Sequence, residues 1–137
     1  MEIQRRFTRP GEGPYSGISF ETRTSEIRNP DGKIIFLQEN VVVPSSWSQI
    51  ATDILAQKYF RKRGVPQQDG TIGGETDARQ VFHRLAYTWT DWGRRHGYFS
   101  TEADADAYYD EMCSMLARQM GAPNSPQWFN TGLFAVY

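Results

Sequence analysis

The sequence predicts a mainly helical domain that carries one small β-hairpin. Three stretches, 44–63, 75–97 and 100–122, repeat apolar residues every three or four positions, as amphipathic helices do. Residues 18–38 instead form two strand-like runs on either side of a turn. The chain of 137 residues is long enough for one domain, and two independent cores are not expected.

The first 43 residues divide into an arm and the hairpin. Residues 1–17 are dense in proline and glycine, which predicts an extended or loose arm. The strand-like runs of 18–43 are separated by Asn29-Pro30-Asp31-Gly32, where Pro30 presets φ and Gly32 tolerates a positive φ. A hairpin alone is marginally stable in water, so we expect it to pack on other elements.

The first two predicted helices have recognisable start and stop signals. The first is expected to follow a cap at Ser45-Ser46 and to run to about Arg63. The second is expected to open at Thr76 and to end at Gly93 or Gly97.

The third predicted helix leads into an unusual C-terminal segment. Its cap is Ser100 or Thr101, and Gly121 fits the position just after its end. Residues 123–137 are then rich in aromatic side chains and finish on the apolar run Leu133–Tyr137. Such a run predicts an exposed strand that seeks a partner, either within a larger sheet or at an interface.

Charge and cysteine content exclude several classes of protein. The formal net charge of −1 gives no electrostatic footprint for nucleic acid or an anionic membrane. No apolar run approaches the ~20 residues that span a bilayer, and the first residues lack the apolar stretch of a signal peptide. Because the single cysteine, Cys113, cannot form an internal disulfide, a reducing, cytoplasmic setting is expected.

The residues alone indicate no catalytic group and no metal ligand. Cys113 lies mid-helix beside Asp110 and Glu111, without the cation or helix N-terminus that activates a thiol, so a buried structural role is favoured. Neither His83 nor His96 has a second ligand at metal-binding spacing.

Two groups of charged residues are interpreted as ordinary helix surface. Four carboxylates of the third helix are expected on its solvated face: Asp104, Asp106, Asp110 and Glu111. Four cations at the end of the first helix complement its dipole: Lys58, Arg61, Lys62 and Arg63. A phosphate or an acidic partner at these cations is the alternative.

The sequence Asn124-Ser125-Pro126 allows two interpretations. A hydroxyl, an amide and free backbone N–H groups after a helix end can bind an anion. Asn and Ser also simply cap turns, and spacing alone favours the cap.

Several motifs, in the same order, resemble the adenosylcobalamin-dependent (class II) ribonucleotide reductases. The resemblance covers nearly the whole chain, and its last motif is similar to the family's Pro-Asn-Ser-Pro…Asn-(Ala/Thr)-Gly segment. The motifs are Arg23–Gly32, Trp47–Lys62, Glu75–Ala86, Tyr108–Met112 and Ala122–Gly132.

The resemblance implies the N-terminal segment or a small subunit of a reductase that makes deoxyribonucleotides, for DNA replication, by a radical mechanism. It implies a three-helix lobe that leads into the first strand of a larger α/β barrel. The expected parts are an arm (1–17), a hairpin (18–43), a helical domain (44–122) and a first barrel strand with the substrate-phosphate segment (123–137). Ser125 is expected to bind substrate phosphate, with Asn124 as its neighbour.

The resemblance also implies that the chain is not active alone. The family's radical and redox cysteines, its acid–base groups and most of its cobalamin site lie beyond residue 137, and Cys113 matches none of them. Adenosylcobalamin is therefore expected in the assembled enzyme and not on this chain alone. The expected partners are the remainder of the reductase and the ribonucleotide.

Two questions stay open at this point. The chain is interpretable as a fragment, a split-gene subunit or a truncated form, and its oligomeric state is undetermined, a homo-oligomer included. The alternative function is a stand-alone binding or regulatory module that docks on a reductase through Trp128–Tyr137 by strand addition.

Overall fold

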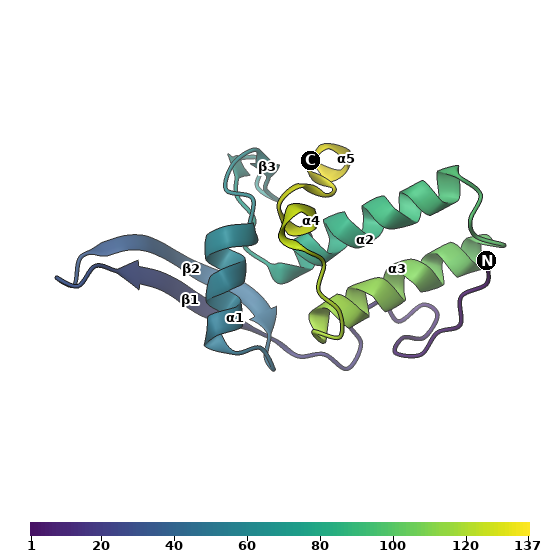
Figure 1. Cartoon of the computed structure of the whole chain (residues 1–137), viewed down its shortest axis with the longest axis horizontal. Coiled ribbons are helices and arrows are strands. Elements are labelled where there is room, and N and C mark those ends of the chain that lie inside the picture. Colours follow the sequence, from purple (N-terminus) through teal and green to yellow (C-terminus); the bar gives the residue numbers. More distant parts are fainter.

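The computed structural model describes all residues, 1–137, and its layout is a hairpin at one side and two long helices at the other (Figure 1). Helices α2 and α3 pack against each other, while α1 contacts the hairpin. In chain order the elements are β1 (Phe20–Arg28), β2 (Ile34–Pro44), α1 (Gln49–Ile54), the π-helical turn η1 (Leu55–Tyr59), β3 (Val65–Pro66), β4 (Ile72–Gly73), α2 (Ala78–Arg95), α3 (Glu102–Ala117), α4 (Ser125–Asn130) and α5 (Leu133–Val136).

The predicted hairpin is confirmed, and its two strands lie close to the expected bounds of 18–43. Strands β1 and β2 pair antiparallel from Phe20 opposite Pro44 to Arg28 opposite Ile34. At the turn, the Gly32 amide donates to the Asn29 carbonyl at 2.8 Å, and Gly32 has a φ of +87°. The base of β2 reaches the core, which supplies the packing that a lone hairpin lacks.

The first helix begins later and ends earlier than predicted. Its cap is Ser48, whose Oγ accepts from the Ala51 amide at 3.0 Å, and not Ser45-Ser46. Ser45 belongs to the hairpin, because its amide donates to the Ser19 carbonyl. The helix stops at Tyr59 because Arg61 pairs with Glu75, both backbone to backbone and through the Glu75 carboxylate.

Capping boxes start both long helices. Asp77 caps α2 with Gln80, one residue after the predicted Thr76, and Thr101 caps α3 with Asp104 as predicted. The prediction that Gly121 ends α3 is wrong. Helix α3 ends at Ala117, and Gln119 takes the left-handed conformation with a φ of +57°.

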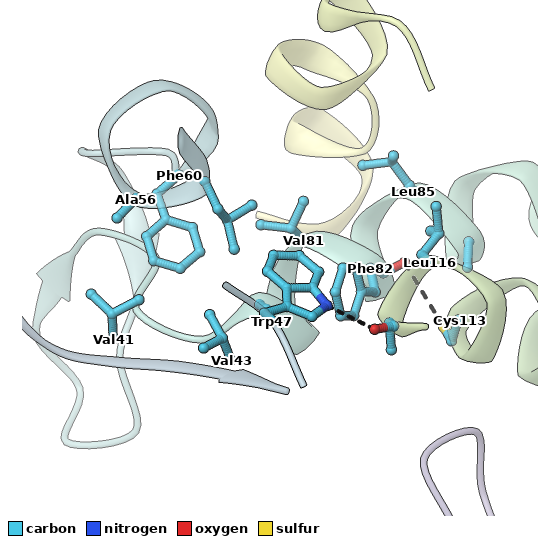
Figure 2. Close-up of a cluster of buried hydrophobic side chains, with 14 residues drawn as sticks. Val41, Val43, Trp47, Ala56, Phe60, Val81, Phe82, Leu85, Cys113 and Leu116 are labelled. Atoms are coloured by element: carbon cyan, nitrogen blue, oxygen red, sulfur yellow. Dashed lines mark hydrogen bonds between the residues drawn. The ribbon is translucent and has the colours of Figure 1, made fainter. Parts of the chain in front are cut away.

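One core joins the hairpin base, α1 with η1, and the facing sides of α2 and α3 (Figure 2). Trp47 packs edge-on against Phe82, and its Nε1 donates to the Ala117 carbonyl at 2.8 Å, which satisfies a carbonyl at the end of α3. Cys113 is fully buried beside the Phe82 carbonyl, and burial raises the pKa of its thiol to about 12. The structural interpretation of Cys113 is confirmed.

The N-terminal arm has no regular secondary structure, but it is held along α3. Arg5 forms an ion pair with Asp110 at 2.7 Å, and the Ile3 amide donates to Asp104 at 2.9 Å. Glu111 accepts from the Arg6 and Phe7 amides and from the Thr8 hydroxyl.

The interpretation of the α3 carboxylates as a solvated face is therefore wrong for three of the four. Asp104, Asp110 and Glu111 bind the arm, and only Asp106 stays on the exposed surface, where it pairs with Arg94. Desolvation alone would raise the pKa of Glu111, but hydrogen bonds from Thr8, Arg6 and Phe7 outweigh it and hold that pKa below its usual value.

The predicted strand at the C-terminus is also wrong. Residues 125–136 form the short helices α4 and α5, so these 137 residues close no barrel. Pro126 in the first turn of α4 is preorganised for a helix, and Gly132, with a φ of +84°, turns the chain between α4 and α5. No helix has both the length and the apolar character that crossing a bilayer requires.

Candidate functional site

Ser125 and Asn124, the two residues predicted to bind phosphate, lie together on the exposed surface at the start of α4. The Ser125 hydroxyl and the Tyr59 hydroxyl form a hydrogen bond of 2.8 Å. Asn124 occupies the N-cap position, but its side chain makes no capping hydrogen bond. The interpretation of these side chains as simple turn caps is therefore not supported, and the exposed Asn124 side chain makes no hydrogen bond within the protein.

Tyr59 connects this surface to the body of the protein. Its ring lies 5.8 Å from the Trp128 ring and 5.1 Å from the Phe129 ring, measured between centroids. Tyr59 is the last residue of η1, and π-helical turns within helices occur frequently at functional sites. The apolar periodicity of the sequence does not predict the π-helical turn that places Tyr59 next to Ser125.

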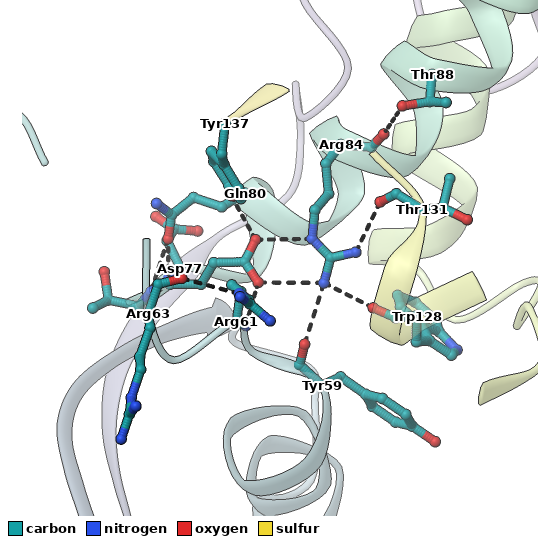
Figure 3. Close-up of polar contacts among 12 residues, drawn as sticks. Tyr59, Arg61, Arg63, Asp77, Gln80, Arg84, Thr88, Trp128, Thr131 and Tyr137 are labelled. Carbon is teal, nitrogen blue, oxygen red and sulfur yellow. Dashed lines mark hydrogen bonds and ion pairs between the residues drawn. The ribbon is translucent and has the colours of Figure 1, made fainter. Parts of the chain in front are cut away.

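A buried ion pair lies behind the segment that carries Ser125 (Figure 3). Arg84 of α2 and Glu75 both have fully buried side chains. Arg84 Nε donates to Glu75 Oε2 at 3.0 Å, and Nη2 donates to Oε1 at 3.3 Å, which is the two-point geometry that an arginine forms with a carboxylate. The two opposite charges are thus buried as a pair.

The remaining donors of Arg84 bind backbone carbonyls from two other segments. Nη1 donates to Thr131 at 3.0 Å, and Nη2 donates to Trp128 at 2.8 Å and to Tyr59 at 3.2 Å. Trp128 and Thr131 lie at the C-terminal end of α4, where carbonyls lack helical partners and a cation is favourable. Arg84 therefore fixes both the segment of Ser125 and the residue that binds its hydroxyl.

Glu75 completes the network from the opposite side. It accepts from the Arg61 amide at 2.7 Å and from the Tyr137 hydroxyl at 2.5 Å. Burial, and then the hydrogen bond to Glu75, raise the pKa of Tyr137 above its usual value. With Arg84, these contacts satisfy both carboxylate oxygens of Glu75, as a buried charge requires.

Gly132 allows the C-terminal segment to lie directly on α2. A Cβ at this position would overlap the Arg84 carbonyl, and the φ of +84° already disfavours any other residue. The chain can therefore pass over Arg84 only with glycine here.

Sequence reasoning proposes Ser125 and Asn124, whose role stays a prediction, and does not single out Tyr59, Glu75 or Arg84. Glu75 and Arg84 both belong to the quoted motif Glu75–Ala86, but Glu75 precedes α2 and Arg84 lies within it, so no shared helix face marks them as a pair. Periodicity cannot tell which charged side chains a fold buries, because that depends on the segment 128–137, which covers them.

The two histidines do not contribute to this site. His83 Nδ1 lies 2.7 Å from the Tyr109 hydroxyl, and burial lowers the pKa of its imidazole. His96 is the exposed C-cap of α2.

Comparison with known proteins supports the family resemblance of the motifs. The family described as class II vitamin B12-dependent ribonucleotide reductase matches residues 21–119. The vitamin B12-dependent ribonucleotide reductase of Bradyrhizobium diazoefficiens is 48% identical over 166 aligned residues, covering 100% of this chain and 13% of that protein. The protein of the same name from Agrobacterium fabrum is 48% identical over 165 residues, with the same coverage. That from Rhodopirellula baltica is 39% identical over 127 residues, covering 93% of this chain and 12% of that protein.

These relatives are several times longer than the chain, which spans 13% of the length of the first two. The family match covers most of the chain, and the alignments with the first two relatives cover all of it. The chain belongs to the class II vitamin B12-dependent ribonucleotide reductase family, in which it corresponds to an N-terminal part.

Proposed function

We propose that the chain acts as the N-terminal part of a reductase that converts ribonucleotides to deoxyribonucleotides, and that Ser125 and Asn124 bind the phosphate of the substrate. Family membership and the position of these two side chains support the proposal. Both are exposed, and both stand on a segment that the buried Arg84 holds in place. That anchoring of an exposed hydroxyl is the observation that carries the proposal.

The chemistry of the surface fits a phosphate oxygen. The Ser125 hydroxyl can donate to an anion while it accepts from Tyr59, so a bound phosphate would not leave Tyr59 unpaired. The Asn124 side chain is free to add a second donor. Because the segment is already fixed by Arg84, little conformational entropy is lost when the phosphate binds.

The chain supplies binding groups and no catalytic residue in this proposal. Its only thiol, Cys113, is buried in the core with a raised pKa, which is unsuited to radical or redox exchange with a substrate. The remainder of the reductase is therefore the proposed partner, and segment 123–137 the proposed junction with it. A cytoplasmic, reducing setting and a role in supplying precursors for DNA replication belong to the same proposal.

The residues of this chain do not fit adenosylcobalamin, the cofactor that the family implies. The cavity that adjoins His83 is about 640 Å³ and the apolar cavity beside Trp92 is about 610 Å³. Cavities of this size suit drug-sized ligands, and a corrin with its nucleotide and adenosyl group is larger than such ligands. His83 Nδ1 is also within 2.7 Å of the Tyr109 hydroxyl, which holds the ring. We therefore propose that the cofactor binds the remainder of the enzyme.

The alternative function, docking on a reductase by strand addition, loses its basis. Residues Trp128–Tyr137 form parts of α4 and α5 and are bound to Arg84 and Glu75, so they present no free strand edge.

Reconstitution tests the proposal. The chain is combined with the remaining reductase polypeptide, and deoxyribonucleotide formation is measured with adenosylcobalamin. Ser125→Ala is expected to weaken ribonucleotide binding by about 1–3 kcal/mol, or roughly 5- to 150-fold, as for a lost hydrogen bond to a charged group. Ser46→Ala, at an exposed serine with no side-chain hydrogen bond, is the matched control. Absence of a complex, or equal affinities of both variants, would contradict the proposal.

A further inference from the structure

An apolar cavity of about 610 Å³ lies between α2, α3 and the segment that follows α3. Its walls include Trp89 and Trp92 of α2, Met112 and Met115 of α3, and residues 121–123. Five of the thirteen residues that line it are aromatic, three are methionine, and none has an acidic or basic side chain. The cavity is therefore suited to apolar groups and not to a charged ligand.

A second cavity, also of about 610 Å³, meets the first at Trp92, which lines both. It lies between α2 and the C-terminal segment, and Tyr87 and Phe134 contribute to its walls. Trp92 is 49% exposed, and Phe134, at 101%, is not covered by any other part of the chain. We call the joint lining of these cavities the Trp92 surface and define it by Tyr87, Trp92, Tyr98, Met115 and Phe134.

The exposed aromatic side chains of the protein are concentrated on the Trp92 surface. Four of the five lie there, namely Tyr87, Trp92, Tyr98 and Phe134, and only Phe129 lies elsewhere. Single exposed apolar residues are common on soluble proteins, but a contiguous patch marks a site of interaction. Aromatic residues and methionine, with few charges, are also the composition that distinguishes the centre of a protein–protein interface.

Polar groups at the Trp92 surface are available to a partner. Tyr98 and Tyr108 line the first cavity, and their hydroxyls form no hydrogen bond within the protein. Burial raises the pKa of Tyr108, so its hydroxyl stays a donor. At the edge of the second cavity, Arg95 pairs with Asp91 at 2.7 Å. An apolar centre with a polar rim is thus already present on the chain.

The position of the Trp92 surface indicates what covers it. Pro123 lines the first cavity and Phe134 the second, and both belong to the segment 123–137 that is the proposed junction with the remainder of a reductase. The chain matches 13% of the length of its relatives, as an N-terminal part, so most of each relative is polypeptide outside the match. That polypeptide is the protein surface continuous with the junction, whereas a second copy of the chain has no such continuity.

We propose that an apolar face of the remaining reductase polypeptide packs on the Trp92 surface. Phe134 inserts into that face, and side chains of the partner fill the cavity between α2 and α3. The inference rests on the proposed function in one respect, that the chain is the N-terminal part of a reductase, and it is independent of the role of Ser125. Because no charged side chain lines the first cavity, binding depends on apolar burial and not on ion pairs.

Titration calorimetry of the 137-residue chain with the remaining reductase polypeptide tests the surface. Phe134→Ala removes a ring that is fully exposed in the free chain, so thermal stability should not change, while the complex should weaken at least about tenfold. Ile50→Ala, at a 72% exposed position of α1, is the matched control and should change the affinity less than about twofold. Added salt should have little effect, and the heat capacity of binding should be negative.

Fluorine NMR of the chain labelled with fluorotryptophan locates the contact. The chain has four tryptophans, and Trp92→Phe assigns the signal of Trp92. Addition of the reductase polypeptide should shift that signal, because docking removes the Trp92 ring from water. The signal of Trp47, which is buried in the core, should stay in place.

Equal affinity of wild type and Phe134→Ala, or an unmoved Trp92 signal in the complex, would overturn this inference and leave the proposed function standing. Dimerisation of the chain alone in sedimentation experiments, abolished by Phe134→Ala, would also overturn it, because a second copy would then cover the surface. A weakened Phe134→Ala complex with unchanged ribonucleotide affinity in Ser125→Ala would contradict only the phosphate role. Absence of any complex would contradict both proposals.

Discussion

The two ends of this chain are both held by charged side chains of a long helix, but in opposite ways. The N-terminal arm lies along α3, where the partly buried Asp104 and Asp110 and the more deeply buried Glu111 accept from its amides and from Arg5 (Figure 1). The C-terminal segment lies on α2, where one buried guanidinium donates to its carbonyls (Figure 3).

The difference lies in exposure to water. Contacts near the surface are weakened by salt and lost when the carboxylates are protonated. A buried arginine that bridges several segments is insensitive to both, but its removal leaves a carboxylate without a partner in the core. The C-terminal attachment is therefore expected to be the stronger one, and it is the one that positions Ser125.

Arg84→Met should have the largest effect on stability. It leaves Glu75 buried and unpaired and frees three backbone carbonyls, so we expect a loss of about 3–5 kcal/mol in the free energy of unfolding. Urea denaturation measures it. Arg79→Met, which breaks the exposed pair with Asp77, should cost less than about 1 kcal/mol. Similar losses in the two variants would mean that Arg84 is not the anchor.

Gly132→Ala should have the next largest effect on stability. The new methyl group meets the Arg84 carbonyl, and the positive φ is unfavourable for alanine, so the expected loss is about 2–4 kcal/mol. Gly121→Ala is the control, because it has open space around it and an ordinary φ. Thermal denaturation compares the two, and a Gly132→Ala variant as stable as Gly121→Ala would disprove the close approach to α2.

At the N-terminal arm, Glu111→Gln should cost about 1–3 kcal/mol at pH 7, the range for hydrogen bonds to a charged group. Because the pKa of Glu111 is lower in the folded protein than in the unfolded chain, this stabilisation is present above the ordinary carboxyl pKa of about 4.3 and is lost as the pH falls through the folded-state value.

The difference between wild type and Glu111→Gln should therefore shrink between pH 7 and pH 3, as measured by urea denaturation at each pH. Glu12→Gln, on the exposed part of the same arm, should show no such dependence. If the difference in the free energy of unfolding between the two proteins is the same at both pH values, the ionised carboxylate does not hold the arm.

Ser125→Ala should have the smallest effect on stability, within about 0.5 kcal/mol, because its hydroxyl is exposed and bonds only to Tyr59. Ser48→Ala, which removes the cap of α1, should cost about 1 kcal/mol in the same denaturation experiment. A loss at Ser125 larger than at Ser48 would indicate a structural role and weaken its assignment to substrate binding.

Local signals predicted much of the fold. The turn at Asn29-Pro30-Asp31-Gly32, the Thr101 cap and the buried Cys113 follow from residue preferences and apolar periodicity, and the structure confirms them. Gly121 does not end α3: the helix ends at Ala117, whose carbonyl accepts from Trp47, a residue 70 positions earlier in the chain. Such long-range contacts override local preferences.

The candidate site was predictable only in part. A motif resemblance predicts Ser125 and Asn124 as phosphate ligands, but nothing local indicates that Arg84 and Glu75 are buried or that Tyr59 faces Ser125. The apolar run Leu133–Tyr137 resembles a strand in sequence because its hydrophobicity can be read from the residues. The hydrogen bond from Tyr137 to Glu75 cannot be read from them. The solvated-face interpretation of Asp110 and Glu111 is wrong for the same reason, since periodicity does not show that the arm covers them through the Arg5 side chain and the Phe7 amide.

Hydrogen exchange in wild type and Arg84→Lys tests the anchoring of the Ser125 segment most directly. Lysine keeps the charge beside Glu75 but lacks the fork that reaches several carbonyls at once. We predict much faster exchange at the Thr131, Val136 and Tyr137 amides, which are hydrogen-bonded within the segment, and unchanged exchange in α3. Equal protection of the segment in both proteins would contradict the account.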